Sequence, residues 1–253
     1  MSRLALEDVR GPPRFSMDDF WVLFEEKYSH MADLRELFKD FESMEMRNRE
    51  LGRATDAMYN FVFQGNPGTG KSTIARELIG PFFCALDIIP YDDVITKRGG
   101  AFQGKFVGQT DGVVEAMFNE AWGRTLFIDE VGALTSPGAL FSKEAIKAML
   151  PFLEDPELRG RFITIIADYE HNIEAFFGLD DGLERRFPYT ITIPDWSVEM
   201  CVDKLIEAVR KKDSAIDLAS HRDLLLELMP DLTSEEKFAN GGTICDSLVG
   251  LIR

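Results

Sequence analysis

The stretch GNPGTGKST, Gly65 to Thr73, decides the fold of this chain. It follows an apolar run, Phe61 to Phe63, and precedes a stretch with helical spacing, Ile74 to Ile79. Its glycines let backbone N–H groups turn toward phosphate oxygens without a Cβ atom in the way. A helix beginning near Lys71 adds the positive end of its dipole. The order of strand, glycine-rich loop and helix therefore predicts a site for the phosphates of a nucleotide.

The side chains of this loop have separate expected roles. Lys71 is expected to reach the β- and γ-phosphates, and the Ser72 hydroxyl is expected to bind Mg²⁺. A glycine-rich turn that binds nothing is the alternative, but the pattern and both flanks argue against it. The residues expected to contact the nucleotide are Asn66, Pro67, Gly68, Thr69, Gly70, Lys71, Ser72 and Thr73.

A second motif is the apolar run Thr125 to Ile128, which ends in Asp129 and Glu130. Asp129 is expected to hold Mg²⁺ through its water shell. Glu130 is expected to polarise a water for attack on the γ-phosphate. Two carboxylates after a strand can also form a helix cap or a surface turn. Together with the glycine-rich loop, however, they predict binding and hydrolysis of ATP or GTP.

Composition excludes several classes of protein. The chain has 253 residues, of which 45% are apolar and 28% charged, as in an ordinary globular protein. Its net charge of −16 repels nucleic-acid backbone and argues against a general DNA or RNA binder. Three widely spaced cysteines and three histidines form no disulfide or zinc pattern. Without a leader or a membrane-length apolar run, we expect a soluble intracellular protein, with the cytoplasm as the first expectation.

Strand and helix patterns alternate from Tyr59 onward, which predicts a parallel α/β sheet. The fold expected is an αβα sandwich over residues 58–195 with a five-stranded parallel sheet, followed by a small all-helical lid over residues 196–253. The expected strands are 59–64, 93–96, 125–129, 162–167 and 189–193. The expected helices are 72–78, 112–122, 142–153, 198–211, 222–228, 234–238 and 244–252.

Residues 1–57 are expected to form a tail followed by helices. Ser16 resembles a helix cap, and aromatic and aliphatic residues recur at helical spacing after it and across residues 31–50. We interpret these apolar residues as packing against the main domain. A face that docks a partner protein is the alternative.

The sequence resembles an AAA+ ATPase, and more narrowly the group of red-type Rubisco activases and stage V sporulation protein K. The resemblance covers roughly residues 58–253. It rests on the GNPGTGK loop, on the LFIDE strand, and on three further segments: Val107 to Thr110, Lys143 to Ile146, and Gly182-Leu183 before Arg186-Phe187-Pro188.

The resemblance implies roles for two further segments. Arg186 matches the arginine finger, which reaches the γ-phosphate of a neighbouring subunit, and Arg185 is the neighbouring candidate. A surface arginine pair is the alternative. The segment Phe106, Val107 and Gly108 matches a loop of the central pore, where an exposed ring grips an extended peptide. A buried phenylalanine is the alternative there, and Phe102 is a weaker candidate.

Two positions depart from the family pattern. The family's sensor-1 residue ends the fourth strand and orients the attacking water, and its place falls near Asp168-Tyr169 here. An aspartate beside the γ-phosphate is repelled unless it faces away or is protonated. The sensor-2 arginine falls within residues 238–242, where Gly242 occupies the matching position. Both departures bear on how fast the chain hydrolyses ATP.

The function implied is that of an ATPase, requiring ATP and Mg²⁺, that assembles into a homo- or hetero-oligomeric hexameric ring and remodels a protein partner in the manner of an activase or chaperone. The partner is not named by the sequence. The chief alternative is a slowly hydrolysing or inactive ATP-binding switch, or a regulatory subunit of a mixed ring. A nucleic-acid motor or clamp loader is disfavoured by the charge, and a small-molecule kinase built on the same loop stays open.

Overall fold

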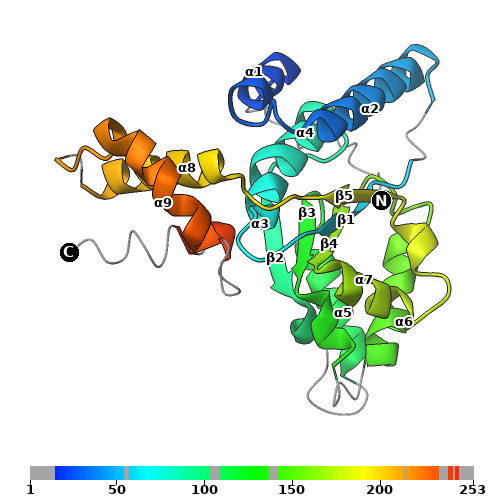
Figure 1. Ribbon diagram of the computed structural model, residues 1–253. Helices are drawn as coiled ribbons and strands as arrows, with labels where there is room; N and C mark the ends of the chain where they lie inside the picture. Colours follow the sequence, from blue (N-terminus) through cyan, green and yellow to red (C-terminus); the bar gives the residue numbers. More distant parts are fainter. Residues whose placement is uncertain are drawn as a thin grey trace. The chain divides into compact units, whose positions relative to one another are not determined.

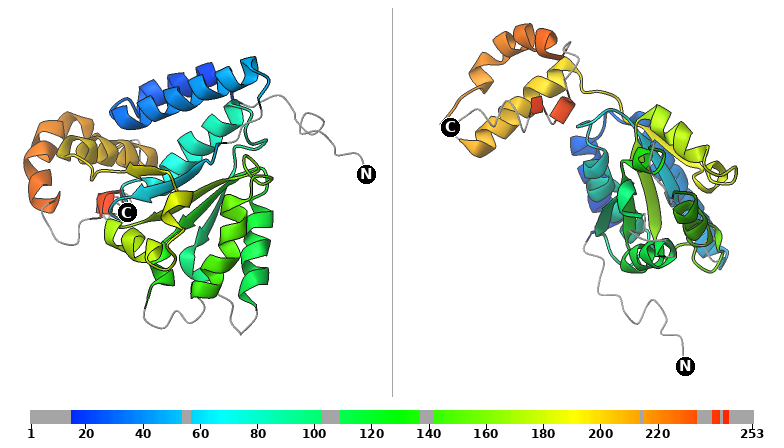
Figure 2. Two further views of the ribbon diagram at one scale, coloured as in Figure 1. Left: turned by 90° about the vertical axis from the view of Figure 1, so that its right-hand side faces the viewer. Right: turned by 90° about the horizontal axis from the view of Figure 1, so that it is seen from below.

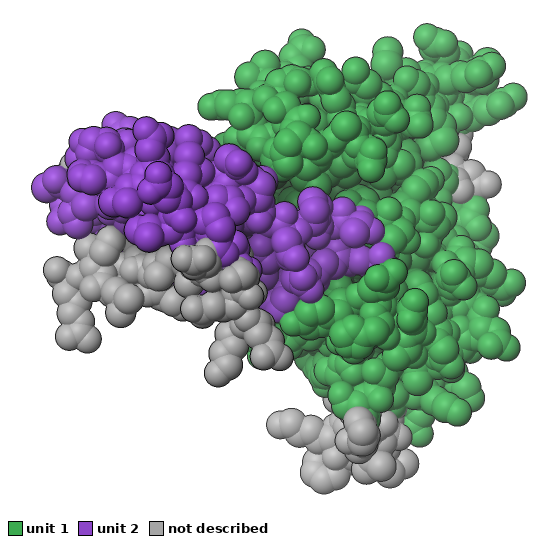
Figure 3. Space-filling view, viewed as in Figure 1, with its two compact units in different colours: residues 1–63, 72–191 green, residues 64–71, 192–253 purple. Residues whose placement is uncertain are grey.

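The computed structural model describes residues 15–53, 57–102, 109–136, 142–213, 215–233, 239–241, 243 and 244. The chain divides into two compact units, shown in different colours in Figure 3. The first unit contains residues 1–63 and 72–191. The second contains residues 64–71 and 192–253, so the glycine-rich loop belongs to the same unit as the C-terminal helices.

A five-stranded parallel sheet forms the centre of the first unit (Figure 1), as the sequence predicts. Its order is β2-β3-β4-β1-β5. The central strand β4 is buried along its whole length, because a parallel sheet is covered on both faces. The strands are β1 (Asn60–Gln64), β2 (Val94–Arg98), β3 (Thr125–Asp129), β4 (Ile163–Asp168) and β5 (Tyr189–Thr192).

Helices of the first unit cover this sheet. Helices α5 and α6 pack against each other, and their apolar side chains join the core under β3 and β4. The predicted helix at residues 72–78 forms as α3 followed by a π-helical turn, Ala75–Ile79. The helices are α3 (Lys71–Ile74), α4 (Gly80–Ala85), α5 (Thr110–Glu120), α6 (Ser142–Glu154) and α7 (Glu170–Phe177).

Helices α1 (Met17–Lys27) and α2 (Ala32–Glu50) lie next to α4, as the left view of Figure 2 shows. Ser16 caps α1 as expected, since its hydroxyl accepts from the Asp19 N–H and the Asp19 carboxylate accepts in return from the Ser16 N–H. Phe20 and Phe38 are fully buried, and their rings lie 5.0 and 4.4 Å from the ring of Phe82 on α4. The interpretation of these aromatics as packing residues is therefore confirmed.

The second unit contains α8 (Val198–Lys212) and α9 (Arg222–Thr233), which pack against each other. The Ser197 hydroxyl caps α8 by accepting from the Met200 N–H. The core of the second unit consists of Cys201, Val202, Leu205, Val209, Met229 and Ile244. The helices predicted at residues 234–238 and 244–252 lie outside the described residues, apart from Ile244. Among the residues that the structure describes, none of the helices has the length and apolarity needed to cross a membrane.

Candidate functional site

The glycine-rich loop has a backbone that only glycine adopts easily. Gly70 has a φ of +102°, a conformation that costs an L-residue with a side chain about 1–2 kcal/mol. Within the described residues, apart from Gly70 and its chain neighbours, no heavy atom lies within 4 Å of the place where a Cβ of Gly70 would point. At Gly65, by contrast, a Cβ would lie 2.5 Å from the carbonyl oxygen of Ile193. The loop is therefore tightly packed at its start and open at its end, where phosphate is expected.

Lys71 folds back across the loop. Its ammonium donates to the carbonyl oxygens of Gly65, at 2.7 Å, and of Asn66, at 2.8 Å. Thr69, which is buried, also donates to the Asn66 carbonyl, at 2.9 Å. An ammonium has three rotatable donors and can exchange carbonyl oxygens for phosphate oxygens. The open position at Gly70 and the Lys71 ammonium fit a nucleoside triphosphate.

Two residues just after β5 hold the loop within the second unit. Asp195 accepts from the Asn66 side-chain amide, at 3.0 and 2.9 Å to its two oxygens. The indole N–H of Trp196 donates to the Thr69 carbonyl at 3.1 Å. Sequence reasoning missed both residues, although the abrupt end of the strand pattern at Pro194 marked their position.

Asn240 ties the same segment together from the C-terminal side. It is only 1% exposed, and it has a left-handed backbone, with a φ of +43°. Its side-chain oxygen accepts from the Trp196 N–H at 2.8 Å, and its amide donates to Asp195 at 2.9 Å and to the Pro67 carbonyl at 3.3 Å. The Gly241 N–H donates to the Gly68 carbonyl at 3.0 Å. Asn240 lies in the stretch predicted to carry sensor 2, so the predicted segment does meet the loop, but through an amide.

Asp129 is the last residue of β3 in the first unit, and Glu130 directly follows the strand. Asp129 accepts from the Glu130 N–H at 3.1 Å. Glu130 is exposed and left-handed, with a φ of +56° and a ψ of +48°. An ion pair of 3.9 Å joins it to Arg98, but both side chains are mostly solvated, so the pair contributes little. A non-glycine residue in this conformation is uncommon and marks Glu130 as a functional candidate.

Asp168, at the sensor-1 place, faces local backbone and side-chain donors. It is 7% exposed. One oxygen accepts from the Tyr169 N–H and from the Asn172 amide, each at 2.7 Å, and the other accepts from the Gly132 N–H at 2.7 Å. Its carboxylate is therefore engaged on both oxygens, as the expectation that it faces away requires.

The arginine pair is split between core and surface. Arg186 has a side chain only 7% exposed, and its guanidinium donates to the Glu154 carboxylate and to the Gly182 carbonyl. Its backbone carbonyl accepts from the Asn60 amide at 2.9 Å. Arg185 is exposed. Both arginines line a cavity of about 630 Å³, with Met58, Pro151, Glu154, Asp155, Pro156 and Arg159.

The pore-loop prediction for Phe106, Val107 and Gly108 lies outside the described residues. Phe102, the weaker candidate, is fully buried in the core of the first unit. That candidate is therefore wrong, because a ring packed inside the domain has no surface with which to grip a peptide.

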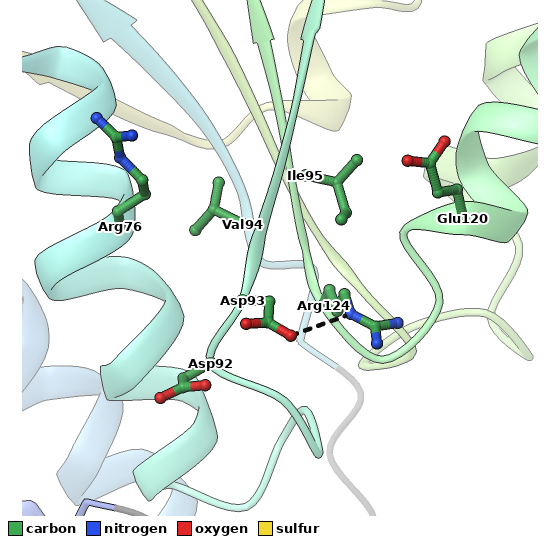
Figure 4. Close-up of a pocket in the computed structure, with 7 residues that line it drawn as sticks. All are labelled: Arg76, Asp92, Asp93, Val94, Ile95, Glu120 and Arg124. Carbon is green, nitrogen blue, oxygen red and sulfur yellow. Dashed lines mark hydrogen bonds and ion pairs between the residues drawn. The ribbon is translucent and has the colours of Figure 1, made fainter.

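A second cavity, of about 830 Å³, borders the first half of β2 (Figure 4). Arg124 pairs there with Asp93 at 3.4 Å and stacks 4.4 Å from the ring centre of Tyr91. None of the residues predicted for the nucleotide lines it; its walls are Arg76, Asp92, Asp93, Val94, Ile95, Glu120 and Arg124.

Metal binding depends on few protein ligands. Within the described ranges, no group of three or more His, Cys, Asp or Glu side chains could hold a metal ion. Mg²⁺ keeps several waters and commonly binds through one or two protein oxygens together with phosphate. Ser72 and Asp129 fit that mode, with the nucleotide supplying the remaining ligands.

Comparisons with known proteins identify the family to which the chain is similar. A family model described as "ATPase family associated with various cellular activities (AAA)" matches residues 61–195. The chain is 32% identical over 185 residues to stage V sporulation protein K of Bacillus subtilis, covering 72% of this chain and 56% of that protein. It is also 32% identical over 185 residues to the ESX-3 secretion system protein EccA3 of Mycolicibacterium smegmatis, covering 72% of this chain and 30% of that protein.

Protein CbbX of Cereibacter sphaeroides is 30% identical over 159 residues, which cover 62% of this chain and 50% of CbbX. The chain thus matches between 30% and 56% of the length of these relatives. The fold is similar to that of the FIGL-1 AAA domain solved with ADP, with a TM-score of 0.56 and 18% identity, over 84% of this chain and 67% of that one.

Proposed function

Because this chain belongs to the AAA family of ATPases, we propose that it binds ATP with Mg²⁺ through residues 65–73 and hydrolyses it. The family resemblance, including the sporulation protein and activase group, is confirmed. The observation that carries the proposal is the loop itself. It is open at Gly70, carries the Lys71 ammonium across its mouth, and is held by hydrogen bonds from Trp196 and Asn240.

Each residue of the two motifs has a distinct part. Mg²⁺–ATP supplies a γ-phosphoryl group whose transfer depends on positioning and charge neutralisation. Lys71 leaves its two carbonyl partners and donates to the β- and γ-phosphate oxygens. Ser72 would hold Mg²⁺ directly, and Asp129 would hold it through water. Glu130, exposed at the end of β3, accepts a proton from the attacking water.

Ring assembly completes the site in this proposal. Arg186 acts on the nucleotide of the neighbouring subunit once its bond to Glu154 is exchanged for phosphate. Arg185 is the alternative, favoured by its exposure. Hydrolysis then moves the loop around Phe106 and remodels a bound protein. Family membership and the names of the relatives support this reading of the ring.

A second candidate function is a slowly hydrolysing switch or a regulatory subunit of a mixed ring. The engaged carboxylate of Asp168 favours it, because three protein N–H donors already occupy acceptor sites of the side chain at the sensor-1 place. Gly242 at the sensor-2 place supplies no guanidinium. Both features lower the expected rate of hydrolysis.

The deciding experiment measures the ATPase rate against protein concentration, with the mass by light scattering in ATP. Wild type, Glu130→Gln and Lys71→Ala are compared. Three results together support the motor. The rate per subunit rises with concentration, Glu130→Gln holds ATP in a ring without turnover, and Lys71→Ala binds no nucleotide. A monomer that binds ATP with negligible turnover at every concentration supports the switch.

A further inference from the structure

We propose that Asp168 is a positioning residue that fixes the catalytic carboxylate of Glu130 by holding the turn directly after it. This inference rests on the proposed ATPase function. It assigns to the sensor-1 place a role that acts through another residue, with no contact to water or phosphate.

The pairing of β3 with β4 places Asp168 beside Glu130. Asp129 and Ala167 are partners in the register of the two parallel strands. Asp168 is the last residue of β4 and Glu130 is the residue directly after β3, so the two follow paired residues and lie side by side. Asp168 belongs to buried β4, whereas Glu130 is exposed and precedes the turn Val131–Leu134. The anchored residue can therefore restrain the exposed one.

The restraint is a hydrogen bond across the two strand ends. The Gly132 N–H donates to Asp168 at 2.7 Å, only two residues after Glu130. The Ala133 N–H donates back to the Glu130 carbonyl at 3.0 Å, which closes the turn around Gly132. The turn is held from inside as well, because Val131 is fully buried. The left-handed backbone of Glu130 is thus fixed on its C-terminal side.

Asn172 supports this arrangement from α7. Its amide donates to Asp168 at 2.7 Å. A Cβ on Gly132 would lie 2.7 Å from the Asn172 side-chain carbon, so Asn172 fills the space beside the turn. Asp168 consequently receives three N–H donors, and no other common side chain of its size accepts all three. An asparagine would set its own NH₂ against one of these donors.

The same hydrogen bonds and the burial of Asp168 argue against a direct role. A residue that orients the attacking water needs an acceptor that faces it. Both oxygens of Asp168 already accept short hydrogen bonds, and the side chain is buried. Its influence on the reaction therefore passes through the direction of the Glu130 backbone, and a small misplacement of a catalytic group can cost about 100-fold in rate.

The test compares Asp168→Ala, Asp168→Asn and the matched control Asn172→Ala in the full chain, under ring-forming conditions. Asp168→Ala should lower kcat about 100-fold with KM for ATP and the nucleotide Kd changed less than about 2-fold. The kcat of Asp168→Asn should lie between those of wild type and Asp168→Ala, since its amide oxygen still accepts from one of the donors. The kcat of Asn172→Ala, which keeps the bond between Asp168 and Gly132, should fall less than about 3-fold. The melting temperature in ATP and the ring mass verify that each variant is folded.

A second arm separates positioning from an independent role. In the Glu130→Gln background, adding Asp168→Ala should leave the residual single-turnover rate unchanged, because its target is already absent. A further 100-fold loss there would overturn the proposal, and so would a wild-type kcat in Asp168→Ala or Asp168→Asn. If the wild type does not hydrolyse ATP, or if Glu130→Gln hydrolyses it normally, the proposed function itself fails and this inference falls with it.

Discussion

Replacement of Asn240 by alanine should weaken nucleotide binding although Asn240 carries no expected contact to the nucleotide. Its side chain makes three hydrogen bonds, to Trp196, Asp195 and Pro67. At about 1 kcal/mol each, their loss costs about 2–3 kcal/mol. Alanine also adds about 1 kcal/mol, because the backbone at this position is left-handed, with a φ of +43°. The total is about 3–4 kcal/mol.

This loss of free energy destabilises the present conformation of the phosphate loop, Gly65 to Thr73. If the held conformation is the one that binds nucleotide, the apparent Kd rises as that conformation becomes less populated, by up to about 100-fold for 3 kcal/mol. Equilibrium titration with a fluorescent ATP analogue measures the Kd. Urea unfolding followed by tryptophan fluorescence measures the loss of stability.

Two variants serve as controls for the alanine change. Asn240→Gly removes the same bonds without the strain, so it should be about 1 kcal/mol more stable than the alanine variant. Asn240→Asp keeps an acceptor for the Trp196 N–H but faces Asp195 with a second carboxylate, and it should bind no better than alanine. A nucleotide Kd within 2-fold of wild type in both the alanine and the glycine variant would refute the reasoning.

Three further predictions concern other parts of the chain. If Arg185 is the finger, Arg185→Ala should lower the ATPase rate of the assembled protein at least about 100-fold with no change in melting temperature. Arg186→Ala should lower the melting temperature in either case, because it removes the bonds of a buried guanidinium to the half-exposed Glu154 carboxylate and to the Gly182 carbonyl; equal melting of both variants would contradict the structure. Tyr59→Phe should lower the unfolding free energy measured in urea by about 1–3 kcal/mol, because the buried hydroxyl donates to the Glu45 carboxylate. Burial raises the pKa of the phenol, so the hydroxyl stays protonated and remains a donor. A loss below about 0.5 kcal/mol would contradict this. Hydrogen bonds from two lysines on α8 lower the pKa of Glu207 to about 2. The stabilisation by Glu207 is therefore complete above the unfolded pKa of 4.5 and is lost as the pH falls toward 2. Because the side chain is half-exposed, it contributes less than about 1 kcal/mol, and the difference in melting temperature between wild type and Glu207→Gln should disappear over that pH range.

The sheet and the phosphate loop could be predicted because their signals are local. The strands β1, β3 and β4 contain short apolar runs, and Gly65 to Ser72 is a motif whose chemistry depends on its own backbone. The helices α4 and α7 escaped prediction because they are short. In α4, Gly80 and Pro81 disguise the pattern further, since they also favour a turn.

The parts of the site that could not be predicted depend on contacts between distant residues. No local pattern says that Arg186 turns inward to Glu154 while Arg185 turns outward. Likewise, the orientation of Asp168 follows from the Gly132 N–H, 36 residues away, and the role of Asn240 follows from a loop 173 residues earlier. Such partners are set by packing, which no single-sequence pattern encodes.

The aromatic packing of α1 and α2 has a practical consequence for any shortened form of this protein. The family match begins at residue 61, which invites a truncation that omits both helices. Such a fragment would expose the rings of Phe82 and Phe83, now fully buried. Contiguous apolar surface of this kind drives aggregation. The smallest soluble nucleotide domain should therefore start before Ser16, and a fragment cut at the family boundary should be recovered as inclusion bodies.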